Sequence, residues 1–402
     1  MPDNFRYQII EYTNGTGIEI GAPHPTWPGF IQVTEDQLKL FGSKVFDFAI
    51  SHVGPVSDEM KRVVKSGGFL CEKKTFNFSH DKQKKTAAVI RYGGFGDVLQ
   101  TSSIFPCLKA DGYHITVYTS PGGADVLKHD PHIDKIIVQG KDQIPNAALG
   151  GYWEYLKGQY GKFINLSESV EGAILTIKDR MPFHWPKAVR HQLFNRNYFE
   201  LMHDIAEVPL PPRPAFYPSE RETRIAQRFV KKLAGGPVIL WVLAGSSVHK
   251  TWPHMDTILA RLLLKYPDCR VILSGDELCK MLETGWENEK RIIKRSGADI
   301  RETLSLINHV DLVIGPETGV MNAAGPLDVP KILFCSHSTP ENCSKYWCNT
   351  INLEPVGCEC YPCHQLHYSF EYCKKDDETG CADCQAKIDI ETVWKSIQGI
   401  FQ

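Results

Sequence analysis

Short apolar runs recur along the chain, and each is followed by a glycine-rich or polar turn and then by an amphipathic stretch. The runs lie at residues 87–90, 115–118, 133–138 and 163–166, and again at 237–242, 270–275, 311–315 and 331–334. Continuous apolar runs are typical of strands buried on both faces, and helical periodicity at 255–266 and 301–309 predicts helices between them. The pattern therefore predicts an α/β fold in which two halves each contain a parallel sheet.

Two polar or proline-rich stretches divide the chain. Residues 209–214 contain four prolines and predict a hinge between the halves. Residues 73–85 are polar and predict a linker that sets off an N-terminal piece. We therefore expect three domains, at residues 1–80, 86–210 and 215–395.

The composition argues against several kinds of partner. Lys and Arg number 45 and Asp and Glu 47, so no overall field attracts nucleic acid or an anionic membrane. The basic stretches at 82–85 and 187–196 are expected to be solvated faces. No apolar run approaches the roughly 20 residues of a membrane helix, and no signal peptide is visible. Thirteen cysteines without such a signal favour metal binding over disulfides. They also favour a cytoplasmic location.

A glycine-rich turn follows the first apolar run of the middle segment. It reads Gly93-Gly94-Phe95-Gly96-Asp97 and leads into a stretch with helical character. Glycines let the backbone take positive φ and let a ligand approach closely. Asp97 is expected at the carboxyl end of a strand, where open α/β sheets place their chemistry.

Two further motifs follow in the second half: Gly245-Ser246-Ser247 with Lys250-x-Trp252-Pro253, and Glu317-Thr318-Gly319-x-Met321. In order and spacing, the three motifs resemble glycosyltransferase family 9, the heptosyltransferase-like enzymes of the GT-B fold, over about residues 86–395. The resemblance implies two Rossmann-like domains that face a cleft, with the acceptor domain at 86–210 and the nucleotide-sugar domain at 215–395. It also implies inverting transfer of a sugar, usually from ADP-heptose, without a catalytic divalent metal.

The resemblance assigns roles to individual residues. It implies that Asp97 is the catalytic base and that Lys250 stabilises the leaving phosphate. The expected donor-binding residues are Gly94, Gly96, Ser246, Ser247, Lys250, Glu277, Glu317, Thr318 and Gly319. The competing interpretations are a helix-capping carboxylate for Asp97, a solvent-facing Lys250 and a surface Glu277. The chain has Glu317 where the family usually has Asp, and Asn322 where it usually has His, which puts an unmodified ADP-heptose specificity in question.

Aromatic and basic residues in the first half are candidates for acceptor binding. They are Trp153, Trp185, Lys187 and Arg190. Aromatic rings can stack on sugar faces and equally on a nucleobase. The acceptor therefore stays open among a lipopolysaccharide-core sugar, a protein side chain, a capsule glycan and a modified nucleic-acid base.

The N-terminal piece resembles a truncated class I S-adenosylmethionine methyltransferase. Gly17-Ile18-Glu19-Ile20-Gly21 predicts a strand and turn, residues 46–51 a second strand and residues 67–70 a third. Residues 62–68 match a recurrent element of that family. Prolines after Gly21 oppose the helix that should follow the cofactor loop. We therefore interpret residues 1–80 as a degenerate, methyltransferase-like segment that does not transfer methyl groups.

Six cysteines cluster near the C-terminus, at 358, 360, 363, 373, 381 and 384. The pairs Cys360/Cys363 and Cys381/Cys384 have the spacing of a zinc ribbon and predict a structural metal, zinc or iron. Cys358, Cys373, His364 and His367 are alternative ligands. We expect this loop to fold as a local module and donor binding to be independent of it.

The sequence thus predicts an inverting glycosyltransferase that uses a nucleotide sugar and can form a homo-oligomer. Two alternatives stay open: a catalytically inactive transferase fold kept as a scaffold, and a glycosyltransferase that acts on a modified nucleic-acid base with the cysteine module as a reader.

Overall fold

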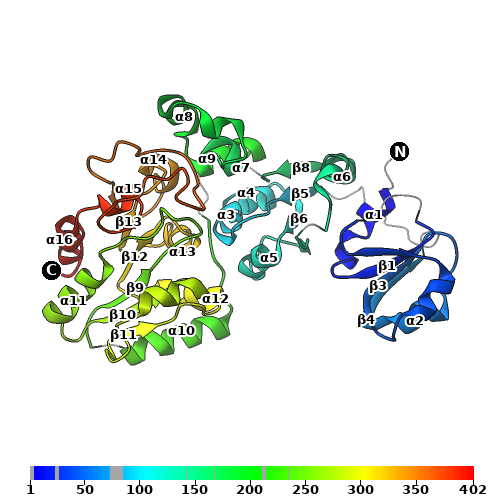
Figure 1. Ribbon diagram of the computed structural model, residues 1–402, viewed down its shortest axis with the longest axis horizontal. Coiled ribbons are helices and arrows are strands. Elements are labelled where there is room, and N and C mark those ends of the chain that lie inside the picture. The colour runs from blue at the N-terminus through cyan, green and yellow to red at the C-terminus, as the bar shows by residue number, and fades with distance from the viewer. Residues whose placement is uncertain are drawn as a thin grey trace. The chain divides into compact units, whose positions relative to one another are not determined.

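The computed structural model describes residues 4–22, 27–72, 85–141, 143–167, 169–210, 214–233 and 235–402. The chain divides into two compact units, and Figure 1 labels their helices and strands. The first unit contains residues 1–92, 108–124 and 132–165, and the second contains residues 93–107, 125–131 and 166–402. The glycine-rich turn at 93–97 therefore belongs to the same unit as the two motifs of the second half. The three domain boundaries expected from the sequence stay predictions.

The second unit is built on a six-stranded parallel sheet with the order β11-β10-β9-β12-β13-β14. Its strands are β9 (Val238–Val242), β10 (Arg270–Ser274), β11 (Ile292–Lys294), β12 (Leu312–Pro316), β13 (Lys331–Phe334) and β14 (Thr350–Leu353). The chain winds outward from β9 in one direction and from β12 in the other. Loops after these two strands diverge at their carboxyl ends, which is where doubly wound sheets bind ligands.

The apolar faces of α11 (Met255–Lys265) and α16 (Ile390–Ile400) pack in one core with the strands of this sheet. The α-helices within the second unit are α3 (Phe95–Gln100), α7 (Ser169–Ala173), α8 (Lys187–Phe194), α9 (Tyr198–Ala206), α10 (Glu220–Leu233), α11 (Met255–Lys265), α12 (Ile300–Leu306), α13 (Gly319–Ala324), α14 (Pro340–Cys343), α15 (Asp383–Ala386) and α16 (Ile390–Ile400). The short 3-10 helices are η3 (Thr101–Ser103), η4 (Met181–His184), η5 (Glu277–Glu283) and η6 (Ile307–His309). The core includes the stacked rings of Trp241 and Trp252 and the ring of Phe334.

The first unit contains two four-stranded parallel sheets, ordered β7-β6-β5-β8 and β2-β1-β3-β4. The strands are β1 (Gly17–Ile20), β2 (Phe30–Val33), β3 (Phe46–Ser51), β4 (Val64–Glu72), β5 (Thr86–Ile90), β6 (His114–Thr119), β7 (Lys135–Val138) and β8 (Lys162–Asn165). Its helices are α1 (Asn4–Gln8), η1 (Ile10–Tyr12), η2 (Glu35–Leu40), α2 (Asp58–Val63) and α6 (Asn146–Gln159). The division of the chain into units falls within α4 (Phe105–Ala110) and α5 (Pro121–Leu127).

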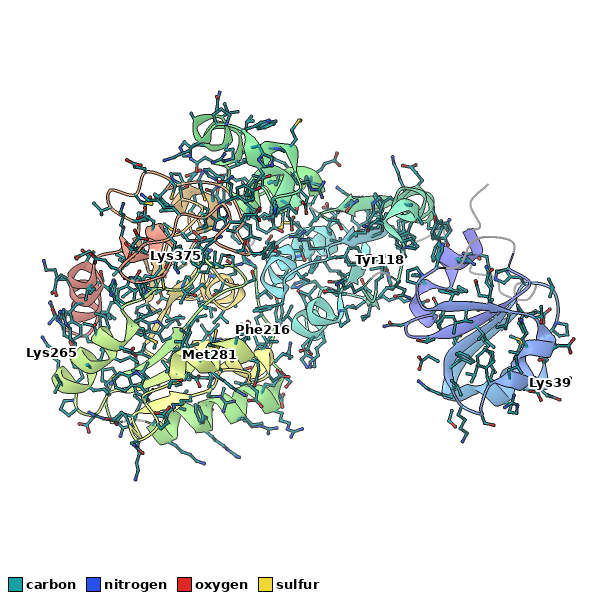
Figure 2. The ribbon with its side chains drawn as sticks, viewed as in Figure 1. Lys39, Tyr118, Phe216, Lys265, Met281 and Lys375 are labelled. Atoms are coloured by element: carbon teal, nitrogen blue, oxygen red, sulfur yellow. The ribbon has the colours of Figure 1, made fainter. Side chains whose placement is uncertain are left out.

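Aromatic packing joins the two sheets of the first unit. Tyr7 of α1 lies against Tyr152 and Tyr155 of α6, with ring centroids 5.3 and 5.7 Å apart, and its hydroxyl donates to the carbonyl of Ala148 at 3.1 Å. Tyr118, labelled on β6 in Figure 2, is buried and its hydroxyl lies 2.8 Å from that of Tyr160. The aromatic residues of α6 thus hold the N-terminal piece on its neighbouring sheet.

The α/β class and the parallel sheets predicted from the apolar runs are confirmed. Three strands were not expected: β2, β11 and β14, so residues 331–334 do not end the series. Residues 187–206 form two helices, α8 and α9, because the side chain of Asn197 accepts from the amides of Phe199 and Glu200 and starts α9 anew. No helix in the described ranges is long and apolar enough to cross a membrane.

A buried ion pair occupies the N-terminal sheet. Glu19 of β1 is fully buried and accepts two hydrogen bonds from the guanidinium of Arg6, at 3.0 and 2.5 Å, while Nε2 of His52 lies 3.1 Å from the same carboxylate. Removing one member of such a pair costs about 3–5 kcal/mol because the other charge stays buried. Arg6 is therefore held at this carboxylate. The proline-rich stretch after Gly21 lies largely outside the described residues.

We expect the full chain to bind no S-adenosylmethionine, because a cofactor at the end of β1 would have to displace Arg6 from Glu19. Isothermal titration calorimetry with S-adenosylmethionine and S-adenosylhomocysteine measures this directly. A dissociation constant in the micromolar range for either compound would contradict the interpretation of this segment as degenerate.

Candidate functional site

A cavity of about 420 Å³ opens where the loops after β9 and β12 diverge. Its size lies in the usual range for small-molecule sites. Its walls come from the start of α3, the loops after β9, β10 and β12, and α12. The lining residues are Gly94, Phe95, Gly96, Asp97, Val242, Ala244, Gly245, Ser246, Lys250, Ser274, Gly275, Asp276, Ala298, Ile300, Thr303, Glu317, Thr318, Gly319, Val320 and Asn322. All three sequence motifs therefore meet in one cavity of the second unit.

Lys250 reaches this cavity from a tight loop after β9. The loop closes through a bridge between Ala244 and Thr251 and a hydrogen bond from the amide of Gly245 to the carbonyl of Lys250 at 3.2 Å. The stem of Lys250 then lies directly on Gly245: a Cβ at Gly245 would be 2.7 Å from Cδ of Lys250 and 3.2 Å from Cγ2 of Thr318. Glycine is required here because any side chain would displace the lysine.

Glu317 lines the cavity, but its carboxylate is bound by the loop after β13. Ser336 donates to it through its amide at 3.1 Å and its hydroxyl at 2.8 Å, and the hydroxyl of Ser338 donates at 2.8 Å. Nδ1 of His337 lies 2.5 Å from the same carboxylate. A carboxylate offers about four acceptor positions, so these contacts occupy its capacity. Its expected part in donor binding stays a prediction.

The charge on Glu317 is stabilised by these neighbours. Burial by itself would raise the pKa of the carboxyl, but His337, Lys250 and the amide of Ser336 hold the pKa of Glu317 well below its usual range. The carboxylate is therefore ionised at neutral pH although it is buried.

Asp97 is brought to the cavity by the close approach of α3 and α13. A Cβ at Gly96 would lie 2.5 Å from Cα of Gly319, and a Cβ at Gly319 would lie 2.3 Å from the ring of Phe95. The two helices can meet this closely only because both positions are glycine. Asp97 follows Gly96 in the first turn of α3, so its carboxylate belongs to the same cavity as Lys250.

Two expected donor residues lie outside the cavity lining. Glu277 is exposed and pairs with Lys280 at 2.6 Å, whereas its neighbour Asp276 lines the cavity and caps η5 through the amide of Cys279. Ser247 is buried, and no partner is found for its hydroxyl among the described residues. Sequence reasoning missed Asp276 and Ser274, because one residue of offset after a strand decides which side chain faces inward.

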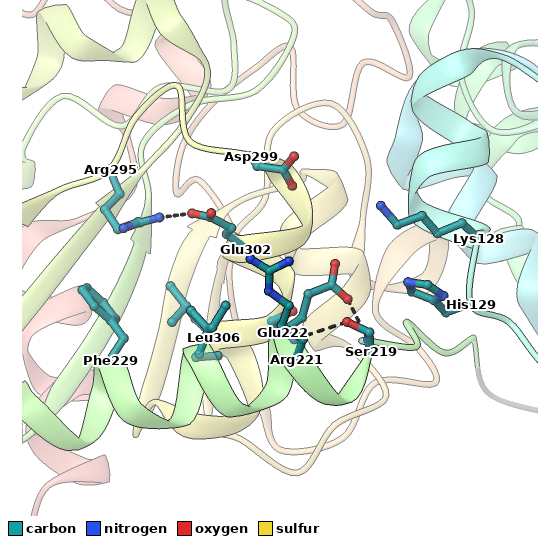
Figure 3. A pocket seen from close by; sticks show the side chains of 13 residues that line it. Lys128, His129, Ser219, Arg221, Glu222, Phe229, Arg295, Asp299, Glu302 and Leu306 are labelled. Atoms are coloured by element: carbon teal, nitrogen blue, oxygen red, sulfur yellow. Dashed lines mark hydrogen bonds and ion pairs between the residues drawn. The ribbon is translucent and has the colours of Figure 1, made fainter.

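A second cavity, of about 470 Å³, lies between α10 and α12 (Figure 3). Its acidic residues already have partners within the protein: Glu302 pairs with Arg295, and Glu222 bonds Arg301 at 2.6 Å and the amide of Ser219 at 2.6 Å. The guanidinium of Arg301 first, and then these hydrogen bonds, lower the pKa of Glu222 to about 2 against the effect of burial. None of the motif residues lines this cavity.

Residues 358–384, which contain the six clustered cysteines and are called the cysteine segment below, include a compact group of ligand atoms. Cys358, Cys360 and Asp383 offer sulfur and oxygen atoms within 4.8 Å of one another, and the two sulfurs are 3.4 Å apart. Thiolates on one tetrahedral zinc are separated by about 3.8 Å, from bonds of about 2.3 Å. The hydrogen bond from Cys358 lowers the pKa of Cys360 although burial opposes this. These ligand atoms therefore fit a thiophilic metal.

The other candidate ligands are distributed unevenly. Cys384 and Cys373 pack with Cys358 in one cluster, and the amide of Cys381 donates to the hydroxyl of Thr379 at 3.3 Å. Both ring nitrogens of His364 have partners, in Ile174 and His191. The quartet expected from the sequence stays a prediction. All thirteen cysteines lie in the described ranges, and none forms a disulfide.

Helix α8 holds the cysteine segment through backbone carbonyls. The ammonium of Lys187 donates to the carbonyls of Glu359 and Tyr361, both at 2.6 Å. The buried guanidinium of Arg190 donates to the carbonyl of Cys363 at 2.8 Å and also to that of Trp185. An acceptor role for these residues stays a prediction. The fourth candidate, Trp153, stacks on Tyr92 in the first unit.

Comparisons with known proteins address the fold. No protein-family model matches the sequence, and no curated protein matches it. A glycosyl transferase of family 9 from Veillonella parvula is similar in structure, with a TM-score of 0.57, 19% identity and coverage of 79% of this chain and 97% of that chain. The ADP-heptose lipopolysaccharide heptosyltransferase II of E. coli gives a TM-score of 0.55, 17% identity and coverage of 78% and 98%.

A third similar structure is the dodecameric iron-containing heptosyltransferase TibC, from enterotoxigenic E. coli, in complex with ADP-D-β-D-heptose. Its TM-score is 0.50 at 14% identity, with coverage of 80% of this chain and 78% of that chain. The resemblance carried by the three motifs is therefore confirmed at the level of the fold: this chain has the GT-B-like α/β fold of glycosyltransferase family 9 structures.

Proposed function

We propose that the protein is an inverting glycosyltransferase that moves a sugar from a nucleoside diphosphate to an acceptor hydroxyl. One observation carries the proposal: Asp97, Lys250 and the Glu317-Thr318-Gly319 turn, which lie far apart in the sequence, line one cavity at the switch point of the six-stranded sheet. A general base, a cation for a leaving phosphate and a turn with hydroxyl and amide donors are the groups that such a transfer needs.

The proposed donor is an ADP-linked heptose or a close relative of it. The similar structures from E. coli support this, since one is an ADP-heptose heptosyltransferase and the other is in complex with ADP-D-β-D-heptose. In the proposed complex, Ser274, Asp276 and Thr303 line the end of the cavity that takes the nucleoside, and Ser246, Lys250 and Thr318 take the diphosphate. Gly94 leaves room for the sugar, and Gly96 serves the site by letting α3 approach Gly319.

In the proposed reaction, the carboxylate of Asp97 removes the proton of the acceptor hydroxyl while its oxygen attacks the anomeric carbon. The bond from that carbon to the diphosphate breaks on the opposite face, so the configuration inverts. The ammonium of Lys250 stabilises the charge that develops on the leaving phosphate, which is the task of a divalent cation in other transferases. No catalytic metal is part of this proposal.

A structural metal, zinc or iron, is the proposed occupant of the cysteine segment. Cys358, Cys360 and Asp383 supply converging ligand atoms, and Cys384 and Cys373 lie in the same cluster. The iron in TibC supports iron as one of the two candidates. The metal would hold the segment together when bound, since ligand binding free energy becomes folding free energy in such modules.

The acceptor and the assembly state belong to the proposal only in general terms. The acceptor is a glycan, a protein or a nucleic acid that presents a hydroxyl. A homo-oligomer is proposed because the similar TibC is dodecameric. Thirteen cysteines that form no disulfide within the described ranges favour a reducing compartment, and a cytoplasmic location is proposed for this reason.

We expect Asp97→Asn to lower turnover by about 10²–10⁴-fold, because the amide keeps the shape of the side chain but cannot take a proton. Release of nucleoside diphosphate from ADP-, GDP- and UDP-sugars, together with donor affinity from calorimetry, measures the effect. Donor affinity should stay within about twofold, since the base acts in the transition state. Equal losses of affinity and turnover would identify a structural carboxylate instead.

We expect Lys250→Ala to weaken nucleoside diphosphate binding by about 10–100-fold, the value of a charge-assisted contact of roughly 1.5–3 kcal/mol. The matched control is Lys265→Ala, at the end of α11 and outside the cavity.

Addition of a chelator should leave the initial rate of the wild type unchanged over minutes. Immediate inhibition that magnesium reverses would contradict catalysis without a divalent metal.

We expect about one zinc or iron per chain by elemental analysis of freshly purified, reduced protein. Cys358→Ser with Cys360→Ser should release it and make residues 355–388 sensitive to limited proteolysis, because the ligands are removed. Cys107→Ser is the control, since Cys107 lies outside the segment. Metal-free protein with all six clustered thiols titrating freely would refute the metal site.

A further inference from the structure

His249 lies beside Lys250 in the loop after β9, and both of its ring nitrogens have partners. The side chain is buried, with Nδ1 3.1 Å from the hydroxyl of Ser336 and Nε2 3.3 Å from the amide of His367. The amide of Val248 also donates to the carbonyl of His367, at 3.0 Å. The loop that carries Lys250 is thus bonded on one side to the cysteine segment and on the other to the loop after β13.

The hydrogen bonds through His249 have a defined direction. The amide of His367 can only donate, so Nε2 of His249 accepts. The Ser336 hydroxyl donates its hydrogen bond to the carboxylate of Glu317 at 2.8 Å. Its oxygen therefore accepts from Nδ1–H of His249. The neutral ring with its proton on Nδ1 satisfies all three bonds. Burial, and next the charges of His337 and Lys250, hold the pKa of His249 well below its usual range.

His367 lies between Cys363 and Cys373, inside the cysteine segment. The segment is held in turn by Lys187 and Arg190 of α8, and the amide of His364 donates to the carbonyl of His337 at 2.8 Å. The cysteine segment therefore contacts the loop that carries Lys250 and the loop after β13, and His249 is the side chain that joins the three pieces.

We infer that His249 is a positioning residue, through which the cysteine segment and the Ser336 loop fix the place of Lys250 in the cavity. The inference rests on the proposed function, in which Lys250 binds the donor diphosphate. It also differs from the expectation that donor binding is independent of the cysteine module. Displacement of a charged contact by about 1 Å is enough to cost most of its effect on binding and rate.

The test compares each nucleoside diphosphate with its monophosphate, since only the diphosphate offers the outer phosphate that Lys250 is proposed to contact. Calorimetry with ADP, GDP and UDP beside AMP, GMP and UMP gives the diphosphate preference of the wild type. We expect His249→Ala to lower this preference by about tenfold and leave monophosphate binding within about twofold. In a Lys250→Ala background, His249→Ala should have no further effect, because it acts through the lysine.

Ser336→Ala and Ser338→Ala form a matched pair that avoids the loss of a buried ring. Both hydroxyls donate to Glu317 at 2.8 Å, but only that of Ser336 also bonds His249. We expect Ser336→Ala to lower the diphosphate preference and Ser338→Ala to keep it. His249→Asn, which retains a donor near the position of Nδ1, should restore part of the preference.

The inference fails if folded His249→Ala and Ser336→Ala keep the wild-type preference, if they weaken mono- and diphosphate alike, or if their effects add fully to that of Lys250→Ala. If His249→Ala does not fold, the comparison of Ser336→Ala with Ser338→Ala decides alone. A wild type that binds none of the six nucleotides would refute the proposed function itself, which is a different result from any of these.

Discussion

The buried carboxylate of Glu317 is the constraint on which the arrangement of the candidate site depends. Burial of an ionised carboxylate costs several kcal/mol unless its acceptor positions are filled. Here they are filled by Ser336, His337 and Ser338, which all come from the loop after β13. The turn that starts α13 and the loop after β13 therefore cannot move independently, because separating them would leave a buried charge without partners.

This requirement also fixes the positions of the neighbouring loops, one after another. The Ser336 hydroxyl that satisfies Glu317 also accepts from His249, and His249 precedes Lys250. On the other side of the cavity, α13 meets α3 at Gly319 and Gly96, where the absence of side chains lets the backbones approach. A cation and an acid from distant parts of the chain are thus placed by contacts to one turn, the turn that begins with Glu317.

The cysteine segment contributes to the same arrangement from outside the cavity. Its ligand-like atoms lie in Cys358, Cys360 and Asp383, while its backbone is held by α8 and bonds Val248 through His367. A segment with little regular structure can hold this position because its carbonyls are paired with Lys187 and Arg190. The cysteine segment and the geometry of the cavity are therefore connected by ordinary hydrogen bonds.

The sequence by itself determined the alternation of strands and helices, the parallel sheets and the three turns that line the cavity. These features are local: apolar runs predict buried strands, and glycine and hydroxyl residues after them predict ligand-binding turns. The short strands β11 and β14 could not be found because their side chains are partly exposed, so neither strand forms a continuous apolar run. Only the tertiary structure decided that Asp276 rather than Glu277 lines the cavity, that Glu317 is bound by the loop after β13, and that Asp383 converges with Cys358 and Cys360. No periodicity in the chain carries this information, because it depends on how the loops fold and, for Glu317 and Cys358, on partners 19 and 25 residues away in the sequence.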